Sequence, residues 1–269
     1  MAPSRLIGRL ASLLLLLTVS ACSTVPITGR KQLNLIPIST MNSMSATEYG
    51  NFLSGAQLST NAIQTDMVRR VGERVQAAVE RYFTSKGMAG ELSNYDWTFN
   101  LVEDPQLNAW CMPGGRVVVY TGILPVTQDE NGLAVVMGHE IAHAIAGHGN
   151  ERMSQGMIQQ LGGVALDKAL EQKPAETRGL WQGVYGISST VGYMLPNSRN
   201  QESEADELGL IFMTMAGYDP HAAIPFWERM SAAAGGAAPP EFLSTHPSDA
   251  TRIEHIRKLL PKALSYQNK

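Results

Sequence analysis

The chain has 269 residues, of which 44% are hydrophobic and 17% are charged, and its formal net charge is −3. This length allows a sizeable hydrophobic core, as expected of an ordinary globular domain. The charge balance shows no basic excess, which argues against nucleic acid as a partner.

The first residues predict a bacterial lipoprotein leader. Basic residues precede an apolar run from Leu10 to Val19, which is too short to span a bilayer as a mature helix. Small residues then lead to Cys22, so residues 1–21 are expected to be a signal peptide and Cys22 the lipidated first residue. Ser23 favours transfer to the outer membrane, so we expect a lipid-anchored protein on the periplasmic side of the bacterial outer membrane. The alternative is a plain signal peptide with an incidental cysteine.

The mature chain is expected to begin with a tether and continue as one domain. Residues 22–45 are rich in Ser, Thr, Pro and Asn and show little periodicity, so they are predicted to form a lipidated tether and an extended segment. Residues 46–269 are predicted to form a single domain. Apolar positions at helical spacing predict an amphipathic helix from Ile63 to Phe83.

Two strands are predicted next. Apolar and polar residues alternate between Trp97 and Val102, and a second strand is expected at Arg116–Tyr120. The stretch Asn108–Gly115 between them is rich in turn residues. Two or three short strands ahead of a long helix predict a mostly helical α+β fold with a small mixed sheet.

The segment after these strands contains H-E-x-x-H, formed by His139, Glu140 and His143. On an α-helix, residues four apart share one face, so the two imidazoles can bind one metal ion. Glu140 lies roughly 100° around the axis from His139, where it can reach a water bound to that ion. This is the general-base position of a zinc peptidase. The alternative is a chance match, with two histidines on an ordinary amphipathic helix.

A zinc peptidase needs a third protein ligand. The best candidates lie after a segment whose helical periodicity is weak. Residues 150–195 predict two helices joined by a mobile loop, with a position over the site as one option. Glu202 and Asp206 then lie four apart on another expected helix. One of them can bind the metal while the other accepts a hydrogen bond from a ligand histidine. Spacing alone leaves Glu204 as an alternative ligand, and a solvated acidic face as the alternative for the whole cluster.

H-E-x-x-H followed by E-x-x-A-D-x-x-G resembles the zinc metallopeptidase family of the CAAX prenyl proteases and the HtpX heat-shock protease, which is of the gluzincin type. Within that family, the chain is similar to a bacterial outer-membrane lipoprotein branch related to the mitochondrial Oma-type protease. The other stretches that carry the resemblance are Ile27–Leu33, Asn108–Ala109, Pro113–Gly115, Ser198–Arg199, Ala216–Pro220 and Ser244–Pro247.

The resemblance implies a thermolysin-like (zincin) core around the H-E-x-x-H helix. Carried over residue by residue, His139, His143 and Glu202 are ligands of one Zn²⁺ per chain. Glu140 is the catalytic base, and Asp206 is the carboxylate that orients a ligand.

Two later residues also match positions near the family's site. His246 and Arg252 are therefore expected to be catalytic, with His246 stabilising the oxyanion or binding the metal as a fourth ligand in a resting state. Without the resemblance, His246 would be an ordinary loop histidine. Trp110 and Cys111 depart from the smaller apolar residue and the alanine usual in the family's substrate-binding stretch.

The expected function is a zinc metalloendopeptidase of the cell envelope that cleaves misfolded or misassembled envelope proteins, a role in protein quality control. Its expected partners are unfolded substrates, a membrane through the lipid on Cys22, and the outer-membrane assembly machinery. An extended substrate would pair with the strand at Val117–Tyr120 or with the chain just before it.

The main alternative function is a zinc-containing periplasmic chaperone or assembly factor for outer-membrane proteins with latent protease activity. A closed four-ligand site that includes His246 would favour it. A hydrolase of peptidoglycan or lipid is a third option, without a dedicated sequence feature.

Overall fold

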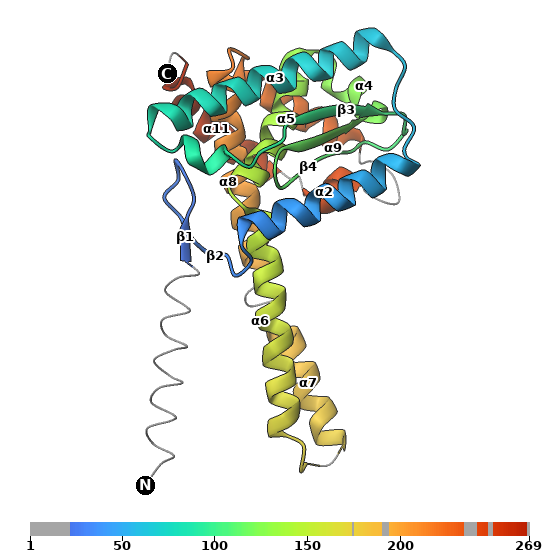
Figure 1. Ribbon diagram of the computed structural model, residues 1–269, viewed down its shortest axis with the longest axis vertical. Helices are drawn as coiled ribbons and strands as arrows, with labels where there is room; N and C mark the ends of the chain where they lie inside the picture. The colour runs from blue at the N-terminus through green and yellow to red at the C-terminus, as the bar shows by residue number, and fades with distance from the viewer. Residues whose placement is uncertain (1–21, 174, 190–193, 234–240, 247–249, 268–269) are drawn as a thin grey trace. The chain divides into compact units, whose positions relative to one another are not determined.

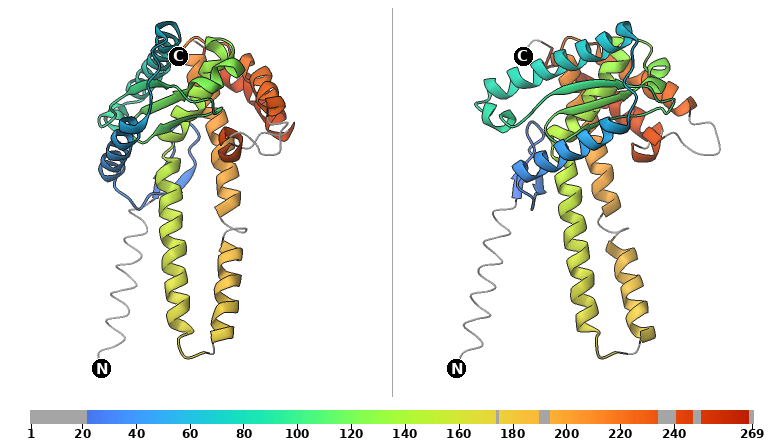
Figure 2. Two further views of the ribbon diagram at one scale, coloured as in Figure 1. Left: turned by 90° about the vertical axis from the view of Figure 1, so that its right-hand side faces the viewer. Right: turned by 45° about the vertical axis from the view of Figure 1, so that its right-hand side comes forward.

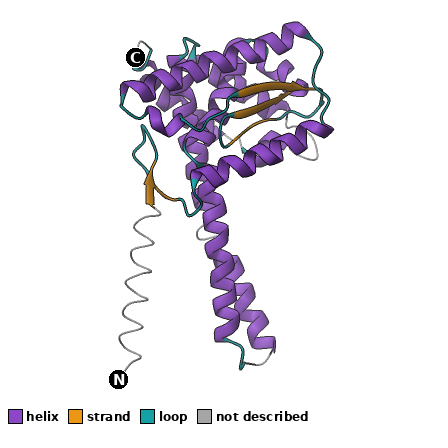
Figure 3. Cartoon of the chain, viewed as in Figure 1, coloured by secondary structure: helices purple, strands orange, loops and turns teal. Residues whose placement is uncertain are grey.

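The computed structural model describes residues 22–267, apart from residue 174 and the segments 190–193, 234–240 and 247–249. The predicted signal peptide therefore lies outside the described residues. Most of the described chain is helical, and its strands form two small sheets (Figure 3). Among the described residues, no helix combines the length and the apolar character needed to cross a membrane.

The chain forms two compact units. The first joins the segment that ends at Pro37 to Gly147–Pro196, and the second joins Ile38–Ala146 to Asn197–Lys269. The predicted single domain of residues 46–269 thus includes parts of both units.

The first unit begins with a two-stranded sheet. β1 (Cys22–Thr24) pairs antiparallel with β2 (Lys31–Leu33). In the turn between them, Gly29 has a φ of 73°, a left-handed conformation that glycine adopts without strain. Cys22 is exposed at the start of β1, and its lipidation remains a prediction.

A helical hairpin completes the first unit. α6 (His148–Ala169) and α7 (Ala175–Ser189) lie side by side (Figure 2). The two helices predicted for residues 150–195 are therefore confirmed. The start of α6 is fastened to the N-terminal segment, because Asn150 Nδ2 donates to the Ile36 carbonyl oxygen at 2.7 Å.

The second unit begins earlier than the sequence predicted. α2 (Ile38–Gly55) starts inside the segment that was expected to be extended. Its first half is rich in Ser, Thr and Asn, and the apolar residues that pack against the sheet lie in its second half. The helix predicted at Ile63–Phe83 is observed as α3 (Ala62–Ser85), and the Asn61 side chain caps it by accepting a hydrogen bond from the Gln64 amide.

A three-stranded mixed sheet lies at the centre of the second unit. β3 (Thr98–Val102) is parallel to β5 (Arg116–Tyr120), and β4 (Ala109–Met112) is antiparallel to β5. The strand order is β3-β5-β4, so β5 is central. The stretch predicted as a turn-rich connection thus contains the edge strand β4.

Helices cover both faces of this sheet (Figure 1). On one face, Tyr49 of α2 packs against Val118, and its hydroxyl accepts a hydrogen bond from Asn100 Nδ2 at 2.6 Å. On the other face lie α3 and α5 (Glu130–Ile145), which contact each other and reach β3 and β4 respectively.

The remaining elements of the described chain are η1 (Ala89–Leu92), η2 (Thr121–Ile123), α4 (Leu124–Thr127), α8 (Leu195–Met215), η4 (Pro220–Ala222), α9 (Ala223–Ala233), α10 (Glu241–Thr245) and α11 (Ala250–Leu264).

Candidate metal centre

The helix α5 carries H-E-x-x-H and is buried along most of its length. The Asp129 side chain caps its first turn by accepting a hydrogen bond from the Gly132 amide at 2.9 Å. His139 and Glu140 are only 2% and 3% exposed. Polar groups this deep in a core are expected to be paired or to bind a metal.

α5 and α8 touch through their backbones beside these residues. A Cβ on Gly138 would lie 2.9 Å from the carbonyl oxygen of Gly209, so neither position has room for a side chain. Such close contact brings the carboxylates one and two turns earlier on α8 next to the imidazoles of α5.

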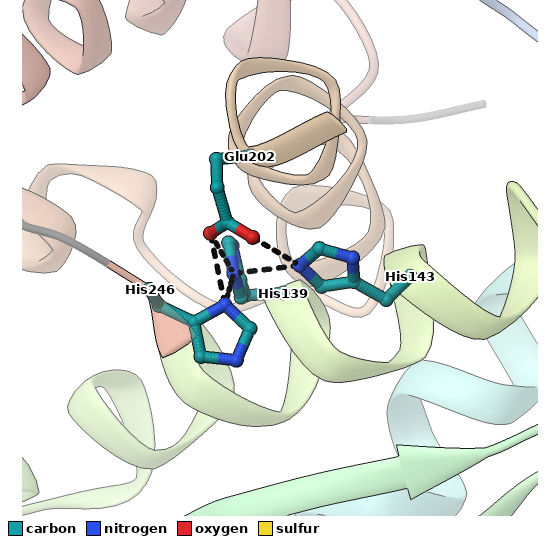
Figure 4. A group of neighbouring side chains, drawn as sticks. All are labelled: His139, His143, Glu202 and His246. Atoms are coloured by element: carbon teal, nitrogen blue, oxygen red, sulfur yellow. Dashed lines mark hydrogen bonds and ion pairs between the residues drawn. The ribbon is translucent and has the colours of Figure 1, made fainter. Parts of the chain in front are cut away.

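Four side chains meet at this crossing (Figure 4). His139 Nε2 lies 3.1 Å from His143 Nε2 and 3.2 Å from His246 Nδ1. Glu202 completes the group. Its Oε1 is 3.3 Å from His143 Nε2, and its Oε2 is 2.8 Å from His246 Nδ1. Three imidazoles and one carboxylate therefore direct a donor atom at one point.

This donor set fits one zinc ion. Zinc prefers nitrogen and carboxylate ligands in tetrahedral geometry, and ligand atoms ~2.0–2.1 Å from a central ion lie about 3.3 Å from one another. The distances of 3.1–3.3 Å that join His139 to the other three residues and His143 to Glu202 are close to that separation, and the 2.8 Å between His246 Nδ1 and Glu202 Oε2 is shorter. Among the described residues, Glu204 is buried but does not belong to this group.

Asp206 orients the first of these imidazoles. Its Oδ1 lies 3.1 Å from His139 Nδ1, so the other ring nitrogen, Nε2, points into the group. Burial acts to lower the pKa of His139, but hydrogen bonds to Asp206 and Glu202 outweigh it and raise that pKa to about 9. In the absence of a metal this imidazole therefore holds a proton at neutral pH.

Arg252 holds Asp206 in place through hydrogen bonds. Its Nε and Nη2 donate to the two carboxylate oxygens of Asp206 at 2.9 and 2.7 Å, and its Nη1 donates to the His246 carbonyl oxygen at 3.1 Å. The guanidinium lies 3.6 Å from the centre of the Trp227 ring. Burial acts to raise the pKa of Asp206, but the Arg252 charge, followed by His139, lowers it. One arginine thus holds both the carboxylate behind His139 and the backbone that carries His246.

Glu140 faces the same space from the next position on α5. Its Oε1 is 3.4 Å from His246 Nε2. Cys111 of β4 lies on the face of the sheet that α5 covers, and burial, with the Glu140 charge adding to it, raises the pKa of the Cys111 thiol. Trp110 packs on the opposite face of the sheet, with its ring 4.9 Å from that of Phe52. Of the two departures from the family pattern, Cys111 is therefore the one that faces the site.

The predicted site residues fall into two groups. The donor group consists of His139, His143, Glu202 and His246, and it is surrounded by Glu140, Asp206 and Arg252.

Two residues that contribute to the site were not predicted from the sequence. The Trp227 ring packs against Arg252, and the Phe242 ring lies 4.7 Å from the His246 ring. Both are buried aromatic residues on helices, a pattern that sequence alone attributes to the core.

Comparison with known proteins identifies a family. Residues 70–260 match the model of peptidase family M48. This match includes every residue of the group and of its surroundings.

Individual relatives agree with the family model. The chain is 33% identical over 246 residues to the mitochondrial metalloendopeptidase OMA1 of Schizosaccharomyces pombe, covering 89% of this chain and 66% of that protein. It is 31% identical over 248 residues to OMA1 of Homo sapiens, covering 89% of this chain and 46% of the relative. The beta-barrel assembly-enhancing protease of Yersinia pestis is 29% identical over 171 residues, covering 59% of this chain and 33% of that protein. The chain thus spans less than two thirds of each of these relatives.

These relatives contradict the predicted location. The proteins that match over 89% of the chain are mitochondrial, whereas the bacterial proteases match over a shorter part at lower identity. A location on the periplasmic side of the bacterial outer membrane was inferred from residues 1–23 alone, outside the part of the chain that the family model covers. That prediction is wrong.

Proposed function

The chain belongs to peptidase family M48, and from that premise we propose that it is a zinc metalloendopeptidase that cleaves unfolded or misassembled proteins. The observation that carries this proposal is the buried group of His139, His143 and Glu202 with Glu140 beside it. We further propose that the core is thermolysin-like, supported by the position of α5 against the edge strand β4.

Three residues of the group would hold the ion, and the remaining residues serve the reaction. A bound zinc ion supplies Lewis-acid polarisation of a peptide carbonyl and lowers the pKa of water. Glu140 is the carboxylate that accepts a proton from the attacking water, holds it, and passes it to the amide nitrogen as the C–N bond breaks. His246 Nε2, at 3.4 Å from Glu140 Oε1, is the donor available to the oxygen of the attacked carbonyl.

Asp206 and Arg252 act through these residues. Asp206 holds the His139 ring in one orientation, and Arg252 holds Asp206 and the backbone of His246. Arg252 is thus proposed to be a positioning residue rather than a group that touches the substrate.

The substrate is proposed to lie along β4. The sequence left the strand at Val117–Tyr120 and the chain just before it open for substrate pairing, and β5 has both of its edges paired within the sheet. β4 pairs with β5 on one edge, and it contacts α5, the helix that carries Glu140. Pairing with this edge would recognise the backbone of an extended chain rather than one sequence, which suits unfolded substrates.

The test combines metal analysis with a cleavage assay on the purified chain. We expect one equivalent of zinc and cleavage of casein, an unfolded protein, that stops on chelation and returns when zinc is added. Absence of bound metal, or cleavage that survives chelation, would overturn the proposal.

A second candidate function is supported by His246. Its Nδ1 completes the donor group, and a site closed by four protein ligands leaves no position for water. This arrangement favours a latent protease that acts mainly as an assembly factor, and the Yersinia pestis relative is named a beta-barrel assembly-enhancing protease. The test is His246→Ala. Faster casein cleavage supports a latent enzyme, and loss of cleavage assigns His246 to catalysis instead.

A further inference from the structure

A cavity of about 470 Å³ lies between α8 and α11 in the second unit. Positions 199, 202, 203 and 206 of α8 form one wall, and positions 251, 252 and 255 of α11 form the other. Because each set repeats at intervals of three or four residues, each belongs to one face of its helix. The volume is within the range of ligand pockets in proteins, ~300–1,000 Å³.

The cavity adjoins the metal-binding group. Glu202 lines it, and the two carboxylate oxygens of this residue lie 3.3 Å from His139 Nε2 and 3.3 Å from His143 Nε2. Asp206 and Arg252, which hydrogen-bond to each other behind His139, also line it. A substrate held at the metal group therefore has this cavity within reach of its nearest side chains.

The walls contain polar side chains that the metal group does not use. Arg199 is exposed, and among the described residues its side chain has no ion pair or hydrogen bond. The same is true, within the described part of the chain, of the Ser203 and Thr251 hydroxyls and of the His255 imidazole. Arginine presents its N–H donors in a rigid fork that matches the two oxygens of a carboxylate. The walls thus offer unused donors to a ligand.

The carboxylates of the walls are already engaged. Glu202 is directed at the imidazoles, and Asp206 is held by Arg252. On α11, Glu254 pairs with Arg257 at 3.1 Å, outside the cavity. The two arginines of the walls balance the two carboxylates, so a zinc ion at the metal group would leave an excess of positive charge. Such a cavity favours an anionic group over a neutral or cationic one.

We propose that this cavity binds an acidic side chain of the substrate, a glutamate or aspartate directly beside the cleaved bond, and that Arg199 selects it. The guanidinium pairs with the carboxylate, and the Ser203 and Thr251 hydroxyls supply further donors. Pairing along β4 holds the extended chain, and the cavity determines which bond is presented. This inference rests on the proposed peptidase function and adds a substrate preference to it.

The first experiment maps the bonds that are cut in dephosphorylated casein by mass spectrometry. The wild-type chain is expected to cut preferentially beside Glu or Asp. Arg199→Gln removes the charge and is expected to lose this preference, whereas Arg199→Lys keeps the charge and should retain most of it. The control Arg257→Gln removes an exposed arginine of α11 outside the cavity, and it is expected to keep the wild-type pattern.

A binding measurement tests the same cavity without any cleavage. A peptide hydroxamate anchors on zinc, so the position of its neighbouring side chain is fixed. Two pairs of hydroxamates, one for each side of the cleaved bond, differ only in carrying Glu or Gln at that position. Calorimetry on the zinc-loaded chain is expected to show about tenfold tighter binding of Glu in one pair, the usual effect of a hydrogen bond to a charged group. Arg199→Gln is expected to bind both members equally.

The outcomes separate this inference from the peptidase function. Cleavage of casein without enrichment of acidic residues would overturn the acidic site and leave the peptidase function intact. Absence of cleavage would contradict the peptidase function, and the hydroxamates would then decide the site. Equal binding of Glu and Gln by the wild type would overturn it. So would a preference that changes equally in Arg199→Gln and Arg257→Gln.

A carboxylate of the chain itself is the rival occupant. Asp249 lies two residues before Thr251 in the sequence, outside the described residues. Asp249→Asn is therefore compared with the wild type in both measurements. A preference for Glu that appears only in Asp249→Asn would assign the cavity to this chain's own aspartate and overturn the proposal, whereas an equal preference in both proteins supports it.

Discussion

Gly138 on α5 and Gly209 on α8 meet without any side chain between them. A Cβ on Gly209 would lie 2.8 Å from the backbone nitrogen of His139, closer than real Cβ atoms approach such an atom. This contact sets the distance between the helix that carries two imidazoles and the helix that carries Glu202. The metal site therefore depends on two residues that have no functional group.

The variant Gly209→Ala tests this dependence. We expect it to push the helices apart, to lower stability by about 1–3 kcal/mol, as overpacked core positions do, and to weaken zinc binding. The measurements are thermal unfolding and zinc competition with a chelator. The control is Gly156→Ala on α6, where a Cβ meets open space, and which is expected to leave zinc binding unchanged. Unchanged zinc affinity in Gly209→Ala would show that the crossing does not position the ligands.

The second prediction concerns Glu140. Glu140→Gln keeps the shape of the side chain but cannot accept a proton, so we expect casein cleavage to fall by ~10²–10⁴-fold. Zinc content should stay at one equivalent, because the residue is outside the donor group. Metal analysis and initial rates measure both effects. Full activity in this variant would rule out Glu140 as the base.

The third prediction concerns Arg252. A lysine keeps the charge but loses the two-pronged contact with Asp206 and the stacking on Trp227, so the two residues are not interchangeable here. Arg252→Lys is expected to weaken zinc binding by ~10–100-fold, the usual effect of disturbing a group that orients a metal ligand. Arg257→Lys changes an exposed arginine on the same helix and serves as the control. Equal zinc affinity in the two variants would contradict a positioning role for Arg252.

The fourth prediction links zinc binding to pH. The pKa of His139 is raised from its ordinary value of 6.5 to about 9, so in the absence of metal the ring holds a proton at pH 7. Zinc must displace that proton, so zinc affinity should rise by about tenfold per pH unit and level off above pH 9. Calorimetry in buffers of different ionisation enthalpy should detect close to one released proton at pH 7. Affinity that is constant from pH 6.5 to 9 would show that the ring is already neutral.

The same shift predicts how the stability of the metal-free chain depends on pH. A histidine whose pKa is higher in the folded state stabilises the fold fully below about pH 6.5, and this contribution is lost as the pH rises through 9. The melting temperature after chelation is therefore expected to fall over this interval. Asp206→Asn removes the leading partner that raises the pKa, and should flatten the fall. An equal slope in both proteins would assign it to other groups.

The sequence by itself determined most of the helices and strands, and which side chains share one face of a helix. H-E-x-x-H predicted two imidazoles on one helical face because helical periodicity is a local property. The same reasoning placed Glu202 and Asp206 on one face of α8, and alternation located β3 and β5. Local reasoning failed for α2, because its first half is rich in Ser, Thr and Asn, although Tyr49, Phe52 and Leu53 of its second half pack against the sheet at helical spacing.

Only the tertiary structure decided how these elements combine. His246 is 44 residues from Glu202 in the chain, yet 2.8 Å separate their side-chain atoms, because α10 ends beside the crossing of α5 and α8. The support of Asp206 by Arg252, which stacks on Trp227, and the position of β4 rather than β5 at an edge of the sheet also depend on contacts between distant segments. Periodicity describes how one segment repeats. Long-range packing fixes which segments meet, and this packing made the buried group that can hold a metal.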